Sequence, residues 1–296
     1  MCRPRLLLSL CALFWAGNFV LARAMHETFP PFALAFWRWA LASALVLPFV
    51  WRPLLRAWPQ IRERPWQMTL LALLGVSGFN TLVYLGLQTT TATNGVLIQS
   101  TMPMLILLLN RLCFGVAVRP LAVVAILLSM LGVAMIIGSG QLSRLFVDDW
   151  NRGDLWILAA AVVWALYSIL LRWRPDGLDP RAFLGFTLLV GTIALLPFFL
   201  FETLLGRSPQ WGVPGLLTVA YVAVFPSALA YLFWNRGVEA IGPNAAGHFI
   251  HVMPVFGVLM AAVFLGERIA WFHVSGALLV AAGIGLSLYP RRDRGD

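Results

Sequence analysis

The stretch Cys11–Arg23, CALFWAGNFVLAR, permits two opposite interpretations. A basic start and an apolar run precede it, and small residues flank Arg23, as in a cleaved secretory signal peptide. However, Trp15 and Arg23 recur 149 positions later as Trp164 and Arg172, far from the N-terminus. We therefore predict that this segment is retained as the first membrane helix.

Further identities extend this repeat along the chain. Two proline pairs share the spacing of 149 positions: Pro31/Pro180 and Pro48/Pro197. A second group, mostly glycines, has a spacing of 151 positions: Met102-Pro103/Met253-Pro254, Gly86/Gly237, Gly115/Gly266 and Gly132/Gly283. Internal repeats of this kind predict two related halves, residues 1–145 and 146–296, with five helices each. Because five is odd, the second half enters the membrane from the opposite side, as in the inverted repeats of many secondary transporters.

The composition is that of an integral membrane protein. Of 296 residues, 60% are hydrophobic and 11% charged, and the mean hydropathy is +0.85. A soluble domain carries about 25% charged residues. The three cysteines lie in or beside apolar segments and predict no disulfide framework. We expect an all-α membrane protein without a soluble domain.

The apolar runs predict ten transmembrane helices. Their expected ranges are 5–25, 32–51, 67–88, 93–114, 121–139, 154–173, 180–201, 214–235, 244–266 and 271–289. The net charge is +9, and all 21 basic residues are arginines, most of them between these runs. They gather in loops on one side, which predicts that both termini are cytoplasmic. The arginines thus set topology, and we expect no nucleic-acid partner.

Three stretches resemble a known family. WAGNFVLARAM at 15–25, PPFALAFWRWALA at 30–42 and AAGHFIHVMPVFGVLMAAVFLGER at 245–268 are similar to the EamA branch of the drug/metabolite transporter superfamily. Within that family the chain looks most like the YddG-type exporters of aromatic and neutral amino acids. The resemblance covers essentially the whole chain. It implies ten helices around a central cavity and a function in the export of small metabolites. One departure is Val116, which stands where the second half has Glu267.

Polar and aromatic side chains at matched depths are the candidate cavity lining, because polar groups within a bilayer usually face the bundle interior. The first predicted helix places Trp15, Asn18 and Phe19 on one face. The sixth places three residues at equivalent positions: Trp164, Tyr167, Ser168. Both tryptophans lie about ten residues into their spans, deeper than the interfacial aromatic belt. Packing between helices remains the alternative.

Two polar stripes follow the helical period in the third and eighth helices. One consists of Asn80 and Tyr84, and the other of Ser227, Tyr231 and Asn235. Each residue alone is equally well explained by hydrogen bonds between helices. Their occurrence in matched helices favours substrate binding.

Matched prolines interrupt the fourth and ninth helices. Pro103 and Pro254 should each free the carbonyl four residues earlier and kink the helix, so we predict hinges there. Such interruptions at equivalent places in two repeats indicate a transport site. Four polar residues surround them and join the predicted site: Gln99, Ser100, His248, His251.

Arg38 is the one strong charge well inside a predicted span. It could bind a substrate carboxylate in a bidentate pair or tie helices together; the resemblance implies a structural role, since the family generally keeps an arginine here. We interpret Glu267 as architectural, at the start of the tenth helix. A small-residue stripe at Ala277, Ala281 and Gly285 predicts close packing of that helix.

We therefore predict a secondary exporter of small amphiphilic metabolites, above all aromatic and other hydrophobic amino acids, in the inner (cytoplasmic) membrane. The expected partners are the lipid bilayer and the small-molecule substrate, with no cofactor, metal or obligate protein partner. No catalytic, phosphate-binding or metal-binding motif is present. A carrier of nucleosides, nucleotide sugars or drug-like compounds is the alternative, and a channel or membrane enzyme is weaker. With no carboxylate deep in a span, we expect transport down the substrate gradient.

Overall fold

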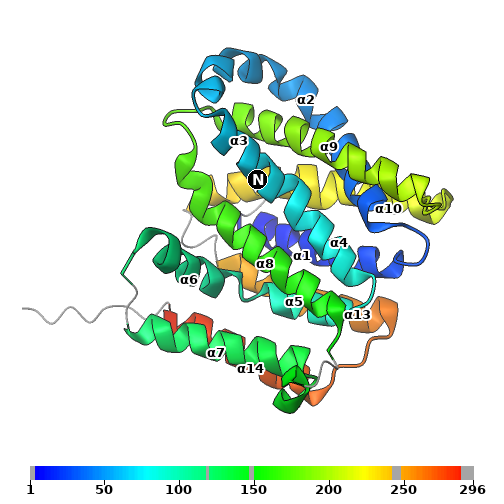
Figure 1. Ribbon diagram of the computed structural model, residues 1–296, viewed down its shortest axis with the longest axis vertical. Helices are drawn as coiled ribbons and strands as arrows, with labels where there is room; N and C mark the ends of the chain where they lie inside the picture. Colours follow the sequence, from blue (N-terminus) through cyan, green and yellow to red (C-terminus); the bar gives the residue numbers. More distant parts are fainter. Residues whose placement is uncertain (1–3, 118–119, 147–149, 242–247, 288–296) are drawn as a thin grey trace, which may run out of the picture.

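The computed structural model describes residues 4–117, 120–146, 150–241 and 248–287, and within these ranges the regular structure is entirely helical (Figure 1). The helices follow one another with short connections. The elements are α1 Pro4–Ala24, α2 Pro31–Glu63, α3 Pro65–Ala72, the π-helix Leu73–Gly78, α4 Phe79–Leu87, α5 Ala92–Gln99, α6 Met102–Phe114, α7 Pro120–Ile137, the 3₁₀-helix Leu142–Phe146, α8 Arg152–Leu170, the 3₁₀-helix Leu171–Trp173, α9 Pro180–Leu204, α10 Val213–Ala223, the π-helix Val224–Leu229, α11 Ala230–Ile241, the 3₁₀-helix His248–Val252, α13 Met253–Leu265 and α14 Trp271–Ser287.

Among the described residues, seven helices are long and apolar enough to cross a membrane. An eighth results if α5 and α6, which meet at 43°, form one broken span. The apolar helices Phe249–Leu265 and Trp271–Leu286 are shorter than the length expected of a span. A helical multi-pass membrane protein is therefore confirmed, while ten complete spans remain a prediction.

The helices pack in pairs around α1. In Figure 1, α2 and α9 lie side by side at one end of the molecule and α7 and α14 at the other, and α4 packs on α8 between them. α1 contacts α13, α11, α4 and α5. It buries residues on several faces, so its first-half and second-half neighbours meet around it. This places α1 at the centre of the fold.

α2 corrects one predicted boundary. The sequence predicts a span ending near residue 51, where the apolar run gives way to an arginine-containing gap, but the helix continues to Glu63. Pro48, Pro53 and Pro59 all lie inside it. Proline is tolerated in membrane helices when neighbouring groups satisfy the backbone that it frees. The extension packs on α9 through Leu54 and neighbouring apolar residues.

The two halves carry the same irregularities at the repeat spacing of 151 positions. The π-helices Leu73–Gly78 and Val224–Leu229 are related in this way. Gly115 and Gly266 are related too, and both end a helix in the left-handed conformation, with φ of 65° and 66°. Single π-helical turns are rare and concentrate at functional sites. The repeat therefore extends to backbone geometry; the boundary between residues 145 and 146 stays a prediction.

Glycines hold α7 against α14. A Cβ added at Gly276 would lie 2.8 Å from the backbone oxygen of Gly132, and one at Gly283 would lie 2.5 Å from that of Ala125. The predicted stripe is therefore wrong in part. Gly285 has no atom within 4 Å of such a Cβ, and Ala281 is exposed. The glycines that contact α7 lie on the neighbouring face of α14. Which face of α14 makes the contact is decided by its packing against α7.

Candidate functional site

A cavity of about 330 Å³ lies where the two halves meet around α1. Its walls come from both halves of the chain and combine aromatic rings with a few polar groups. The lining residues are Trp15, Asn18, Phe19, Arg38, Trp39, Phe79, Asn80, Val96, Gln99, Ser100, Met102, Pro103, Ile106, Trp164, Pro226, Tyr231, Trp234, Ile250, His251, Met253 and Pro254. Small-molecule sites are typically such apolar cavities with a few placed polar groups.

Arg38 is the hub of the polar groups. Its side chain is 4% exposed. Its Nε donates to Ser227 Oγ at 2.9 Å, and its Nη1 lies 3.0 Å from Asn18 Oδ1. The same Nη1 lies 2.8 Å from both Asn80 Oδ1 and Tyr84 Oη. The guanidinium thus links α1, α2, α4 and the second π-helix, which agrees with the structural interpretation of this arginine.

The predicted polar stripes divide between the cavity wall and this network. Asn80 and Tyr231 line the cavity. Tyr84 lies outside the lining, is 1% exposed and donates to Asn18 Oδ1 at 2.7 Å. Ser227 supports Arg38 and donates to Val222 O at 2.8 Å. The side chain of Asn235 lies outside the described part of the chain.

Four of the aromatic rings that line the cavity lie in two contacting pairs. The Trp15 ring lies 5.8 Å from that of Trp234, and the Trp164 ring lies 4.8 Å from that of Phe79. Trp15 Nε1 also donates to the carbonyl of Pro226 at 3.1 Å, so this ring is held across the two halves. Aromatic faces at these separations can stack on an aromatic or apolar ligand.

Two residues predicted beside Trp164 do not line the cavity. Tyr167 packs on Gly75 of the first π-helix, where an added Cβ would lie 2.7 Å from its ring. Ser168 Oγ donates to the carbonyl of Trp164 at 2.8 Å. The prediction placed all three on one helix face. Past Trp164, this face of α8 is covered by the first π-helix, which packs closely on Tyr167.

The predicted kinks at the two prolines need a correction. Pro103 lies in the first turn of α6, after α5 has ended at Gln99, and Pro254 lies in the first turn of α13. A proline there costs no hydrogen bond, because the first N–H groups of a helix lack partners anyway. α5 and α6 are separate helices that meet at 43° before Pro103, whereas before Pro254 the 3₁₀-helix His248–Val252 runs directly into α13. Proline thus starts the second segment, and a hinge there remains a prediction.

The broken backbone brings Gln99, Ser100 and His251 to the cavity. Gln99 Nε2 donates to the carbonyl of Ile157 at 3.1 Å, whereas its buried Oε1 has no partner. Ser100 Oγ donates to the carbonyl of Leu97. The side chain of His248, the other predicted histidine, lies outside the described part of the chain.

Tightly packed apolar residues lie beside the cavity, and two of them, Phe19 and Val96, line it. Phe19, Leu87 and Val96 are at most 3% exposed. A Cβ added at Gly95 would lie 3.0 Å from the Phe19 ring and 3.3 Å from Leu87. One added at Gly257 would lie 2.6 Å from Val96 Cγ1. We call Phe19, Leu87, Gly95, Val96 and Gly257 the plug.

A polar layer near the start of α5 backs the plug. Asp154 is 1% exposed and accepts from Thr90 Oγ1 and from Asn94 Nδ2. Asn94 Oδ1 in turn lies 3.0 Å from His273 Nε2. The layer therefore joins α5 to α8 and α14. Sequence reasoning missed Asp154, because its place near a helix end suggested exposure.

Glu267 belongs to the same layer. Its carboxylate accepts from the backbone N–H groups of Ala92 and Thr93 at 2.8 and 2.9 Å. Glu267 therefore has an architectural role, but it caps the N-terminus of α5 and not the N-terminus of the tenth predicted helix. This contact joins a second-half loop to a first-half helix.

We expect Glu267→Ala to destabilise the folded protein by about 2 kcal/mol, because two helix N–H groups lose a charged acceptor. Thermal unfolding in detergent measures this effect. The matched control is Glu27→Ala, since Glu27 is exposed and its ion pair in the described part of the chain is a long one, with His26 at 3.9 Å. An unchanged unfolding temperature in Glu267→Ala would contradict the capping role.

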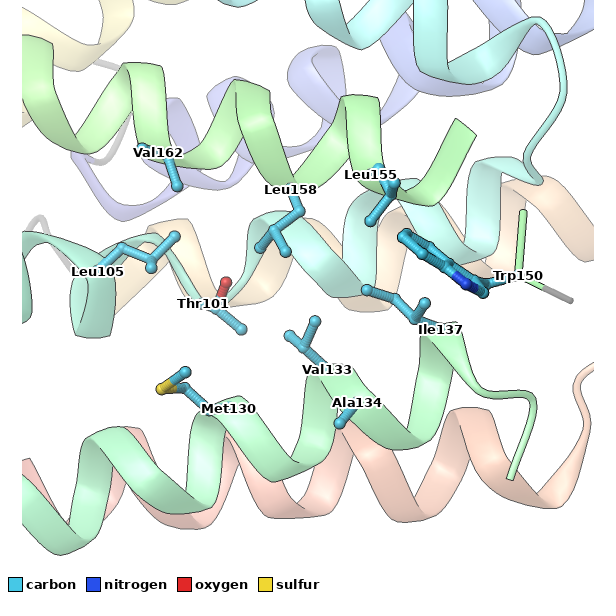
Figure 2. Close-up of a pocket in the computed structure, with 10 residues that line it drawn as sticks. All are labelled: Thr101, Leu105, Met130, Val133, Ala134, Ile137, Trp150, Leu155, Leu158 and Val162. Carbon is cyan, nitrogen blue, oxygen red and sulfur yellow. The ribbon is translucent and has the colours of Figure 1, made fainter. Parts of the chain in front are cut away.

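A second cavity, of about 350 Å³, lies between α7 and α8 (Figure 2). Nearly all its lining is aliphatic, and the sticks in Figure 2 show Leu158 and Val133 reaching toward it from opposite helices. Thr101 Oγ1 donates to the carbonyl of Ile98 and is not free for a ligand. The lining of this groove is mostly apolar, so the candidate site is the cavity around Arg38.

Known proteins similar to this chain are transporters. The EamA-like transporter family matches residues 4–138 and again 151–289. The uncharacterized transporter YyaM of Bacillus subtilis is 30% identical over 279 residues, covering 92% of this chain and 89% of that protein. The uncharacterized inner membrane transporter YedA of Escherichia coli is 25% identical, covering 95% and 90%. A chloroplastic WAT1-related protein of Arabidopsis thaliana is 23% identical, covering 94% and 67%.

One solved crystal structure has the same fold. It matches with a TM-score of 0.61 at 20% identity and covers 96% of both chains. The double family match agrees with the internal repeat that the sequence predicts. Two matches that together span most of the chain, and a 30% identical relative aligned over nearly its full length, show the family. This protein belongs to the EamA-like transporter family.

Proposed function

We propose that this protein is a secondary exporter of small amphiphilic metabolites, chiefly aromatic and other hydrophobic amino acids, from the cytoplasm across the inner membrane. The observation that carries the proposal is the cavity between the two halves. It offers stacking surfaces on Trp15 and Trp164 and a fixed cation, Arg38. An amino acid with an apolar side chain matches this combination.

The transport mechanism in this proposal is alternating access by ten helices in two inverted five-helix repeats, with both termini in the cytoplasm. The π-helices at the repeat spacing and the prolines in the first turns of α6 and α13 support it, because related halves can exchange conformations across a shared site. In this proposal the plug and the polar layer close one end of the cavity. With cytoplasmic termini, α1 runs outward from Pro4, so the closed end faces outward and substrate enters from the cytoplasm.

A carrier of phosphorylated solutes fits this cavity less well. Nucleotide sugars bring several negative charges, which cationic groups must balance in a low-dielectric site. Among the described lining residues, Arg38 is the one permanent cation. Amino acids need no more than one.

The test is radiolabelled phenylalanine counterflow in liposomes that contain only this protein. We expect uptake driven by internal unlabelled phenylalanine and none driven by internal nucleotide sugar. An imposed pH gradient with equal substrate on both sides should drive no accumulation. Absence of counterflow for phenylalanine, tryptophan and leucine would refute the proposed substrate class.

We expect Trp164→Ala to weaken phenylalanine and tryptophan transport about fivefold to tenfold more than alanine transport, because the stacking partner of the substrate ring is lost. Apparent affinities for the three substrates, obtained from competition, measure this change in selectivity. Trp156→Ala is the matched control, since Trp156 is on the same helix but 45% exposed. Equal losses for all three substrates would show that Trp164 only supports the packing of Phe79 and Tyr167.

A further inference from the structure

The charge on Arg38 has no counterion in the described part of the chain. All four of its hydrogen-bond partners are neutral side chains. Salt bridges among the described residues are His26–Glu27 and Arg181–Asp179, and none of these four residues lines the cavity. A buried charge is costly unless it is paired. The cavity is therefore electrostatically complementary to a negatively charged group.

The geometry leaves one edge of the guanidinium for that group. The four hydrogen bonds use Nε and Nη1, so the network holds the side chain in place without using Nη2. The neighbouring Trp39 packs under the guanidinium, 4.8 Å from ring centroid to Cζ. Its buried Nε1 has no hydrogen-bond partner among the described residues, and Trp39 lines the same cavity. Two donors thus remain for a carboxylate.

Gln99, which lines the same cavity, carries a buried acceptor without a partner among the described residues. The carbonyl of Ile157 can only accept, so the amide nitrogen of Gln99 must face it, which leaves Gln99 Oε1 unpaired in this part of the chain. Gln99 is 4% exposed. An unsatisfied buried polar atom carries a free-energy penalty that a ligand donor removes. A substrate ammonium can supply that donor.

We propose that Arg38 Nη2 and the Trp39 indole N–H bind the carboxylate of a zwitterionic substrate and that Gln99 Oε1 accepts a hydrogen bond from its ammonium group. The inference rests on the proposed function and sharpens it: the site selects for both charged groups of an α-amino acid. Cationic amines without a carboxylate are rejected, because they add a second positive charge beside Arg38.

Competition against labelled phenylalanine in the unmodified protein tests this selection. We expect unlabelled phenylalanine to compete best and 3-phenylpropionate, which lacks the ammonium, about tenfold less well. Phenylalaninamide and phenethylamine, which lack the carboxylate, should not compete at tenfold higher concentration. Equal competition by either amine would overturn the inference while leaving the proposed function intact. Absence of phenylalanine counterflow would instead refute the proposed function.

Two variants assign the groups. Trp39→Phe keeps the ring but removes its N–H, and should weaken phenylalanine and 3-phenylpropionate by an equal factor of about three or more. Trp37→Phe is the matched control, since Trp37 Nε1 is also buried and unpaired but Trp37 lies outside the cavity lining. Equal effects of the two variants would overturn the role of Trp39.

Gln99→Leu should weaken phenylalanine about tenfold and leave 3-phenylpropionate unchanged, so that the two compounds compete alike. Weakening of both compounds by the same factor would show that Gln99 only supports α8 through Ile157. Thermal unfolding of each variant verifies that the fold persists. If Gln99→Leu does not fold, the ammonium contact is judged by the ratio of the two compounds in the unmodified protein, where equal competition overturns it.

Discussion

Gly276→Leu is expected to abolish folded, monodisperse protein. A Cβ at this position would lie 2.6 Å from Ile136 Cγ1 and 2.8 Å from the backbone oxygen of Gly132, so α7 and α14 must move apart. Between membrane helices the hydrophobic effect is weak, and association depends on close van der Waals packing. Overpacking alone costs about 1–3 kcal/mol, and a clash with backbone cannot be relieved by a change of side-chain rotamer.

The control for this substitution lies in the same helix. Gly285→Leu introduces the same side chain where an added Cβ meets no atom within 4 Å. We expect Gly285→Leu to elute as the unmodified protein in size-exclusion chromatography and to unfold at nearly the same temperature. Equal behaviour of the two variants would mean that α7 and α14 do not pack through Gly276.

Gly257→Val is expected to reduce substrate flux to background in a protein that still folds. The three atoms nearest to an added Cβ are all from Val96, at 2.6, 2.8 and 3.0 Å. The plug then cannot close, while the conformation in which α5 and α13 have separated stays accessible. Alternating access requires both conformations, so transport stops. Phenylalanine counterflow and thermal unfolding together measure this.

A compensating substitution separates gating from general damage. In the double variant Val96→Gly with Gly257→Val, the new valine occupies the space of the old one, and we expect at least a tenfold recovery of flux. Val96→Gly alone costs about 1 kcal/mol of helix propensity and removes a side chain of the plug, so the flux of the double variant is compared with that of both single variants. Full flux in Gly257→Val, or no recovery in the double variant, would be incompatible with a closing plug at this position.

The sequence by itself determined the class of this protein and predicted part of the lining of its cavity. Apolar runs and arginine loops predicted a helical membrane protein, and identities such as Trp15 with Trp164 predicted the repeat. These signals are readable because the bilayer imposes helices of defined length and makes buried polar residues rare. For the same reason Asn18 and Gln99, polar residues within apolar segments, were predicted as lining before any contact was known.

Only the tertiary structure decided how these side chains are used. Arg38 became a hub because four partners from three other elements converge on it, which no local pattern encodes. Asp154 was missed because its burial depends on α4 and α5. Tyr167 does not line the cavity, because a π-helix from another part of the chain packs on it. Periodicity tells which residues share a helix face, but the partner that each face meets is set by long-range packing.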